Sequence, residues 1–302
     1  MSDHRLRAHA YTADVDTRGA SLRTFAHDGR PLVLPYPNGA PRPSYRGATL
    51  APWTNLLCGD GYRTAETVVR FGDDRERLHG LVADADFALA RRTPSRIDLV
   101  TEVTPSDDYP WRLAVTVRYR LHVGGLTQTV TATNTGDGRA PWGCGGHPYV
   151  VAGPSPLEEW TLRLPAAQVL LVDPDLVPQR LLDVAHDSGR FDFRRGRPIG
   201  DTLLDHAFTG LETPDARIPT VQVRDPSGCG VEIEMSEACG WVQLYTSDDE
   251  PGDDRRRALA VEPMTCAPDA FRNAEHAHDT GIVLLPPGAS ASATWTIRAI
   301  GE

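Results

Sequence analysis

Two histidines and one glutamate stand out in this 302-residue sequence because of the residues that flank them. His147 lies within Gly143–Tyr149, where glycines precede it and a proline follows it, and His79 directly precedes Gly80. Glycine lets the backbone approach a ligand closely and proline fixes the next φ, so such a histidine is held in one orientation. Glu262 follows the apolar run 258–261. Burial at this position would raise the pKa of its carboxyl group toward the neutral range in which a general base works. We therefore expect acid/base chemistry, with a hydrogen-bonded core histidine and an exposed strand-end glutamate as the structural alternatives.

The composition narrows the chemistry further. All 31 basic residues are arginines, and the absence of lysine removes Schiff-base and lysine general-base mechanisms. A net charge of −10 argues against binding to nucleic acid or to anionic lipid, both of which need a basic surface. No apolar stretch approaches the roughly 20 residues of a membrane helix, and the first residues lack the apolar region of a secretory signal.

The five cysteines are widely spaced and form no Cys-x-x-Cys pair. Free thiols are typical of a reducing compartment, so we expect a cytoplasmic protein. The cysteines are Cys58, Cys144, Cys229, Cys239 and Cys266.

Short apolar runs punctuated by glycine and proline predict the strands that must position these side chains. Apolar and polar residues alternate over 113–123, Gly124-Gly125 predicts a turn, and 127–133 predicts the returning strand of a hairpin. A second hairpin is expected over 221–235, turning at 225–228. The other predicted strands are 68–71, 97–103, 241–245, 259–261 and 293–299.

No linker, repeat or long amphipathic helix divides the chain, so we predict one all-β domain over residues 1–302, a large antiparallel β-sandwich. The charged segment 248–257 is expected to be a solvated hairpin tip. Six histidines are expected at the surface, and Asp205 by itself looks like a loop residue. Those histidines are His4, His9, His27, His122, His186 and His206.

Several segments, taken together and in this chain order, resemble the aldose 1-epimerase (galactose mutarotase-like) family. The similarity runs from Gly19-Ala-Ser-Leu22 to the C-terminal strand. The resemblance implies the large sandwich of that family, with a sugar cleft on one sheet and no metal or cofactor. The segments are Arg46–Asn55, Gly59–Tyr62, Leu78-His79-Gly80, Gly146–Tyr149, Leu204–Phe208, Gln243–Thr246 and Ala260–Ala270.

Carried over position by position, the resemblance makes Glu262 the general base and His147 the general acid, with His79 assisting. Mutarotation removes the proton of the anomeric hydroxyl while the ring oxygen is protonated, so the sugar ring opens and can close on the other face. The implied partner is a small sugar, and the protein is expected to be a monomer or homodimer. The resemblance also implies that Asp205 hydrogen-bonds sugar hydroxyls, and Asn55, Gln243, Tyr149 and Trp53 are expected to bind the substrate with it. Tyr149, Trp53, Trp142 and Trp241 are candidates for stacking on the apolar face of the sugar, although the sequence favours a core role for each of them.

One position departs from the family pattern. Members commonly carry Asn-Arg where this chain has Asn55-Leu56, so the cation expected to hold a sugar hydroxyl is missing. Arg46, Arg63 or Arg75 are the candidates to replace it. If Leu56 makes the cleft more apolar, galactose should bind weakly and another or a modified sugar should bind better.

Three alternatives stay open from the sequence. The first is a sugar-binding sandwich without catalysis, and the second is a mutarotase for a phosphorylated or sulfonated sugar, which would need an arginine or amide cluster for the anion. The third is a metal site at His276-Ala-His278, with Glu275, Asp279 or Cys144 as further ligands, which the spacing disfavours because no second pair of ligands accompanies it.

Overall fold

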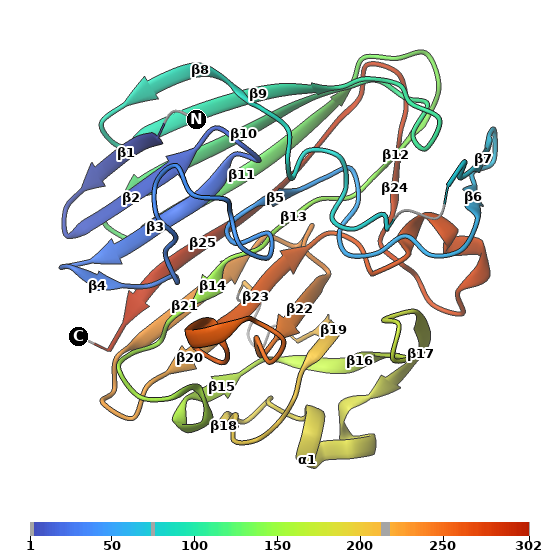
Figure 1. Cartoon of the computed structure of the whole chain (residues 1–302). Helices are drawn as coiled ribbons and strands as arrows, with labels where there is room; N and C mark the ends of the chain where they lie inside the picture. The colour runs from blue at the N-terminus through green and yellow to red at the C-terminus, as the bar shows by residue number, and fades with distance from the viewer. Residues whose placement is uncertain (1–2, 74–75, 213–217, 302) are drawn as a thin grey trace.

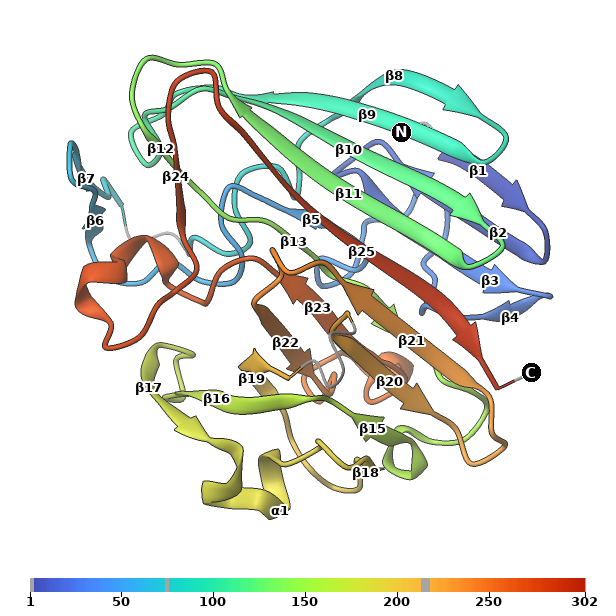
Figure 2. The same ribbon diagram turned by 180° about the vertical axis from the view of Figure 1, so that it is seen from behind.

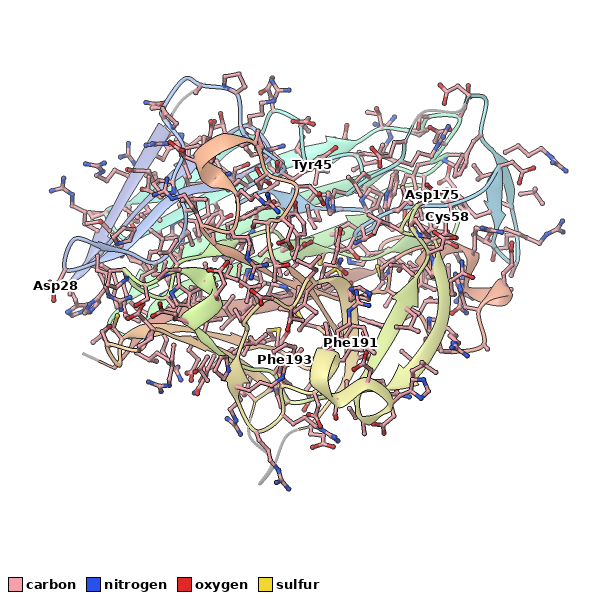
Figure 3. The ribbon with its side chains drawn as sticks, turned by 60° about the horizontal axis from the view of Figure 1, so that its bottom comes forward. Asp28, Tyr45, Cys58, Asp175, Phe191 and Phe193 are labelled. Atoms are coloured by element: carbon pink, nitrogen blue, oxygen red, sulfur yellow. The ribbon has the colours of Figure 1, made fainter. Side chains whose placement is uncertain are left out.

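Antiparallel β-strands make up nearly all regular structure in the computed structural model, which describes residues 3–73, 76–212 and 218–301 (Figure 1). The described part of the chain has one α-helix, α1 (Ser188–Phe191), and a few short 3₁₀ turns. Figure 3 labels Phe191 and Phe193 beside α1, and both rings are buried, which anchors this short helix to the core. The predicted all-β sandwich is therefore confirmed. No helix in these ranges is long and apolar enough to span a bilayer.

One layer is a nine-stranded sheet, seen from behind in Figure 2. Strand β10 alternates buried and more exposed residues along its length, as its period-two pattern predicts, and sends one row of side chains into the core. In spatial order the strands are β18 (Arg197–Pro198), β15 (Thr161–Arg163), β20 (Thr220–Arg224), β21 (Gly230–Met235), β25 (Ser290–Ile300), β11 (Gly125–Asn134), β10 (Leu113–His122), β9 (Arg96–Val103) and β8 (Ala88–Thr93).

The opposite layer contains an eight-stranded sheet and the N-terminal sheet, which lie over different parts of the nine-stranded sheet (Figure 1). The N-terminal sheet is β1 (Asp3–Ala8), β2 (Tyr11–Asp16), β3 (Ser21–His27) and β4 (Arg30–Pro31). The eight-stranded sheet is β17 (Pro178–Asp183), β16 (Ala166–Val172), β19 (Asp205–Leu211), β22 (Trp241–Tyr245), β23 (Leu259–Met264), β13 (Gly145–Gly146) and β5 (Thr49–Leu50), with β14 (Tyr149–Val150) also paired to β23. Two ribbons complete the set, β6 (Gly61–Arg63) with β7 (Val68–Arg70), and β12 (Ala140–Trp142) with β24 (Val283–Leu285).

The main apolar core fills the space between the layers and draws on residues from Leu6 to Ile297. Trp142, Trp160 and Trp295 are almost fully buried in it. The layers are thus held by side chains from both ends of the chain, and the sheet that carries the acidic candidates packs against a rigid partner.

The predicted hairpins form, with one shift in a turn. His122 pairs with Gly125, so the connecting residues are Val123 and Gly124, and Gly125 already belongs to β11. A Cβ at Gly125 would lie 2.2 Å from the carbonyl oxygen of Ile297 on β25, which explains why glycine is needed inside the strand.

The expectations about exposure were confirmed in part. Segment 248–257 connects β22 to β23 and is exposed at most of its positions, as expected, but Glu250 is buried and Arg256 is ion-paired to Glu158 and Asp248. His4 and His206 are buried rather than at the surface. Strand β23 continues past the predicted end at Val261, so Glu262 lies inside a strand, and its side chain is buried as the acid/base interpretation requires.

Candidate active site

Three neighbouring strands bring polar side chains to one face of the eight-stranded sheet. Gln243 on β22 lies directly opposite Glu262 on β23, and Asp205 on β19 lies opposite Tyr245 on β22. Directly opposed residues of antiparallel strands point to the same face, and the side-chain period of two keeps Gln243 and Tyr245 together. The pairing therefore collects Asp205, Gln243 and Glu262, which are far apart in the sequence.

His147 reaches this face from the short connection between β13 and β14. Its amide N–H donates to the carbonyl of Ala48 at 3.0 Å, and its own carbonyl accepts from the N–H of Gly47 at 2.8 Å. A Cβ at Gly146 would lie 2.6 Å from the indole of Trp295, so glycine is required for the backbone to sit this deep. The glycines before His147 thus position the imidazole, as the sequence suggested.

His79 is held by an unusual backbone and a backbone hydrogen bond. Its φ is 61°, and that of the following Gly80 is 79°, where a Cβ would lie 2.0 Å from the carbonyl oxygen of Ala51. The amide N–H of Asn55 donates to Nδ1 of His79 at 3.2 Å. Since Nδ1 accepts, the proton of the neutral ring lies on Nε2, and His79 is fixed as a hydrogen-bond donor. Tyr45, labelled in Figure 3, packs its ring against His79 with centroids 4.6 Å apart.

His147 and Glu262 form the closest acid/base pair of the site. Nε2 of His147 lies 3.4 Å from Oε1 of Glu262, and both side chains are almost completely buried. The ring of His79 meets that of His147 edge to face, with centroids 5.0 Å apart. Three titratable groups therefore share one small volume.

Burial shifts the pKa of each of these groups toward its neutral form. Desolvation raises the pKa of Glu262 well above its ordinary range, and the charge of Asp205 adds to the rise. Desolvation lowers the pKa of His147 to about 3, and the charges of Arg42 and Arg46 lower it further. The pKa of His79 is lowered by burial and then by His147. Desolvation therefore favours a pair in which Glu262 is protonated, His147 is neutral, and the two side chains share one proton.

Asp205 is oriented by its neighbour Gln243. Nε2 of Gln243 donates to Oδ1 of Asp205 at 2.6 Å. Burial raises the pKa of Asp205, while the hydrogen bond from Gln243 lowers it in part. The other carboxylate oxygen stays open to accept a hydroxyl.

A cavity of about 310 Å³ opens over these groups. Six of the eight residues predicted to catalyse or to bind the sugar line it, and Gln243 and Trp53 do not. Gln243 does not line the cavity but donates a hydrogen bond to Asp205, which does. The lining residues are Ser44, Tyr45, Asn55, Leu78, His79, His147, Tyr149, Leu176, Asp205, Tyr245, Asp249, Glu250 and Glu262.

Trp53 does not line this cavity. It is buried in the core, where its indole packs against Phe271 and donates to the carbonyl of Arg77 at 3.1 Å. Trp142 and Trp241 are buried as well and do not border the cavity. The structure therefore gives these tryptophans packing roles.

Several lining residues had no signal in the sequence. Asp249 and Glu250 come from the segment taken for a solvated tip, and Leu176 comes from the connection between β16 and β17. Tyr45 lies on the segment before β5. Only the non-glycine residues with positive φ, among them Tyr45 and Leu176, mark these segments as unusual, and that property is not visible in the sequence.

Arg46 and Arg63, two of the arginines proposed to replace the missing family cation, do not border the cavity. Leu56 is half-buried, forms a backbone β-bridge with Leu78, and is not among the lining residues. Arg46 is buried and ion-paired to Glu250 and Asp254, and Arg63 is exposed on β6. Arg75 lies outside the described residues.

The side chains of the site also include potential metal ligands. His79, His147 and Glu262 are the one group of three potential ligands found within 3–73, 76–212 and 218–301, with donor atoms within 4.8 Å of one another. However, one nitrogen of His79 accepts from a backbone N–H and the other carries the proton, so neither has a free lone pair. The arrangement fits proton transfer better than metal coordination.

Within the part of the chain that the structure describes, no third potential ligand joins the alternative pair of histidines in a compact group. Nε2 of His276 lies 3.1 Å from Oδ2 of Asp269, and the rings of His276 and His278 are 5.3 Å apart. Cys144 is buried elsewhere, beside Thr265. These residues form a hydrogen-bonded loop rather than the predicted alternative metal centre.

Fold and site together define a large antiparallel β-sandwich with a buried histidine–glutamate pair in a polar cavity on one sheet. The comparison with protein families agrees, because residues 3–298 match the family described as aldose 1-epimerase. The chain therefore belongs to the aldose 1-epimerase family, as the sequence motifs indicated.

Two relatives from Escherichia coli strain K12 are similar over most of their lengths. The uncharacterized protein YihR is 30% identical over 274 residues, covering 89% of this chain and 85% of that protein. The uncharacterized protein YphB is 23% identical over 305 residues, covering 99% of both chains.

Solved structures show the same fold. A GalM/aldose epimerase homologue from C. elegans superposes with a TM-score of 0.85 at 18% identity, covering 99% of each chain. Galactose 1-epimerase from Lactobacillus acidophilus superposes with a TM-score of 0.79 at 19% identity, covering 98% of this chain and 94% of that one.

Proposed function

We propose that the protein is a mutarotase that interconverts the α and β anomers of a free, uncharged hexose. The observation that carries the proposal is the buried contact between His147 and Glu262, 3.4 Å apart at the floor of a polar cavity. Acid/base ring opening needs one group that takes a proton and one that gives a proton, and neither a metal nor a cofactor.

In the proposed reaction the sugar lies over the pair, with its anomeric hydroxyl toward Glu262 and its ring oxygen toward His147. Glu262, as the carboxylate, takes the proton of the anomeric hydroxyl, and His147 gives a proton to the ring oxygen as the bond between the anomeric carbon and that oxygen breaks. The electron pair of the O–H bond forms the aldehyde carbonyl. Rotation about the bond between the first two carbons and reversal of both transfers close the ring on the other face and restore both groups.

The other cavity residues support binding of hydroxyls. The Nε2–H of His79 is a fixed donor near the acid/base pair, and Asp205 offers a carboxylate oxygen as acceptor. Such a mixture of one donor and several acceptors suits a ring that carries alternating hydroxyl groups.

The charge of the lining favours an uncharged sugar over an anionic one. Four carboxylates border the cavity, Asp205, Asp249, Glu250 and Glu262, and none of its described lining residues is an arginine. A phosphate or sulfonate needs cationic or amide donors, so the anionic-sugar alternative has less support.

We take residues 1–302 as one domain because the main core draws on both ends of the chain. A cytoplasmic location is supported by the five cysteines, which are all unpaired. The enzyme would act on a free sugar as a monomer or homodimer.

The test is the rate of anomer exchange, followed by polarimetry and by exchange NMR, for a panel of neutral, phosphorylated and sulfonated hexoses. Glu262→Gln should lower kcat by on the order of 10²–10⁴-fold, the usual contribution of a general base. Glu159→Gln, at an exposed glutamate far from the cavity lining, is the matched control. If wild type binds a sugar but exchanges no anomer, the non-catalytic binding protein is correct instead.

A further inference from the structure

A buried ion pair lies next to the cavity on the side of Tyr149. The guanidinium Nη2 of Arg46 lies 3.6 Å from Oε2 of Glu250, and the exposed fractions of the two side chains are 3% and 2%. Arg46 also contacts Asp254 at 3.1 Å. A buried ion pair is costly to form, so its presence beside the cavity calls for a role.

This ion pair is connected to Tyr149. The hydroxyl of Tyr149 lies 3.1 Å from Oε1 of Glu250 and 3.2 Å from the carbonyl oxygen of Ser44. Both partners are acceptors, so the single hydroxyl proton of Tyr149 is directed at them and away from the sugar. The guanidinium carbon of Arg46 stands 5.2 Å from the centre of the Tyr149 ring.

Tyr149 in turn supports the imidazole of His147. The two rings are stacked, with an interplanar angle of 8° and centroids 5.1 Å apart. Nδ1 of His147 is buried and has no hydrogen-bond partner among the described residues. The stacked ring of Tyr149 therefore fixes the plane of the His147 imidazole, with Nε2 directed toward Glu262.

We propose that Arg46 and Glu250 are positioning residues that hold Tyr149 against His147 and set, through their opposite charges, the pH range in which the His147–Glu262 pair keeps its shared proton. This inference rests on the proposed mutarotase function for its kinetic readout. It revises the expected role of Tyr149 from a ring that stacks on the sugar to a ring that supports the imidazole of His147.

The charges around the pair determine the direction of each effect. His147 contacts Glu262, His79 and Tyr149, and the cations Arg42 and Arg46 act on it. The carboxylates that line the same cavity are Asp205, Asp249 and Glu250, of which Glu250 contacts the Tyr149 hydroxyl. Removing a nearby positive charge raises the pKa of every group in the pair, and removing a nearby negative charge lowers it. The two substitutions should therefore shift the pH profile in opposite directions, which a merely structural role would not do.

The experiment measures kcat/KM for anomer exchange against pH, after subtraction of the uncatalysed rate. Arg46→Met should move the whole profile to higher pH and Glu250→Gln should move it to lower pH, each by about 0.5 pH unit or more. Gln at position 250 can still accept from Tyr149, so its effect isolates the charge. Arg46→Lys should restore the profile of wild type, and the exposed Arg255→Met is the matched control on the same segment.

Arg46→Met leaves Glu250 buried without its partner and can fail to fold. The double variant Arg46→Met/Glu250→Gln removes both charges, and its profile should return close to that of wild type. Shifts in the same direction for the two single variants, or no shift in Glu250→Gln, would overturn the proposal.

A wild-type protein that exchanges no anomer would refute the proposed function and leave this inference testable. In that case the ¹⁵N shifts of the His147 imidazole, assigned with His147→Gln, report the same charge effects without catalysis. Identical titration in wild type and Glu250→Gln would then refute the positioning role.

Discussion

The imidazole Nε2 of His147 lies 3.4 Å from Oε1 of Glu262, with 6% and 2% of the two side chains exposed. Strong desolvation disfavours both the imidazolium and the carboxylate, yet the proposed reaction needs an acid and a base at this point. A single proton shared by the pair provides both an acid and a base. When the proton moves from Glu262 to His147, the neutral pair becomes a carboxylate and an imidazolium, and no proton is gained or lost. The predictions below follow from this contact and from the residues around it.

The pH dependence of catalysis should be bell-shaped. Below the first pKa of the pair a second proton binds and removes the base, and above the second pKa the shared proton is lost and removes the acid. Because burial lowers the pKa of His147 to about 3, the second proton binds only in acid, and the acid limb should lie below the ordinary His value of 6.5. Because burial raises the pKa of Glu262, the shared proton is kept to higher pH, and the alkaline limb should lie well above the ordinary Glu value of 4.5. The profile of kcat/KM by polarimetry checks this, and an acid limb above 6.5 would contradict it.

Glu262→Gln should make the folded protein more stable at neutral pH. A raised pKa in the folded state means that this carboxyl contributes stability below its ordinary pKa, which is lost as the pH rises through the folded-state value. The uncharged glutamine avoids that loss, so Tm should rise above wild type at pH 7–8, by about 2–4 °C for each kcal/mol gained. The difference should close toward pH 4. A lower Tm than wild type at pH 8 would refute the assignment, with Glu159→Gln as the control.

Asp205→Asn should weaken sugar binding more than turnover. Asparagine keeps the shape and a hydrogen bond to Gln243 but loses the charged acceptor, and a hydrogen bond to a charged group contributes roughly 1.5–3 kcal/mol. We expect KM to rise at least about tenfold while kcat stays within about threefold of wild type. A fall in kcat with unchanged KM would instead place Asp205 in the proton transfer.

Gly80→Ala should disrupt the site from the backbone. The φ of Gly80 is 79°, and a Cβ there would lie 2.0 Å from the carbonyl oxygen of Ala51, so the segment that carries His79 must shift. Strain of this kind costs about 1–3 kcal/mol, and we expect both a lower Tm and a lower kcat. Gly240→Ala, where no atom lies within 4 Å and φ is ordinary, is the matched control and should be near neutral.

Galactose should be a poor substrate. No described arginine borders the cavity, and Leu56 stands where family members commonly have the arginine that holds a sugar hydroxyl. Loss of one charged hydrogen bond raises KM by about tenfold or more. A low KM for galactose with ordinary turnover would refute this expectation, and the sugar panel would show which hexose replaces it.

The sequence by itself determined the sheet content and the chemistry. Alternation over 113–123 places one row of β10 in the core whatever the tertiary context, because the side-chain period of a strand is two. Likewise, the motifs around His79, His147 and Glu262 indicated the family, which the family comparison confirms, and singled out the groups that we propose to react. These are local properties, and local properties can be read from one stretch of chain.

Only the tertiary structure decided what surrounds those groups. The exposed look of 248–257 gave no hint that Glu250 is buried against Tyr149, because the partner Arg46 lies some two hundred residues away in the chain. Trp53 was a candidate for stacking on the sugar, and its packing against Phe271 places it in the core. Burial, and with it the shifted pKa of Glu262 and the charge of the cavity, depends on strands that pair across the whole sequence, and no single segment contains that information.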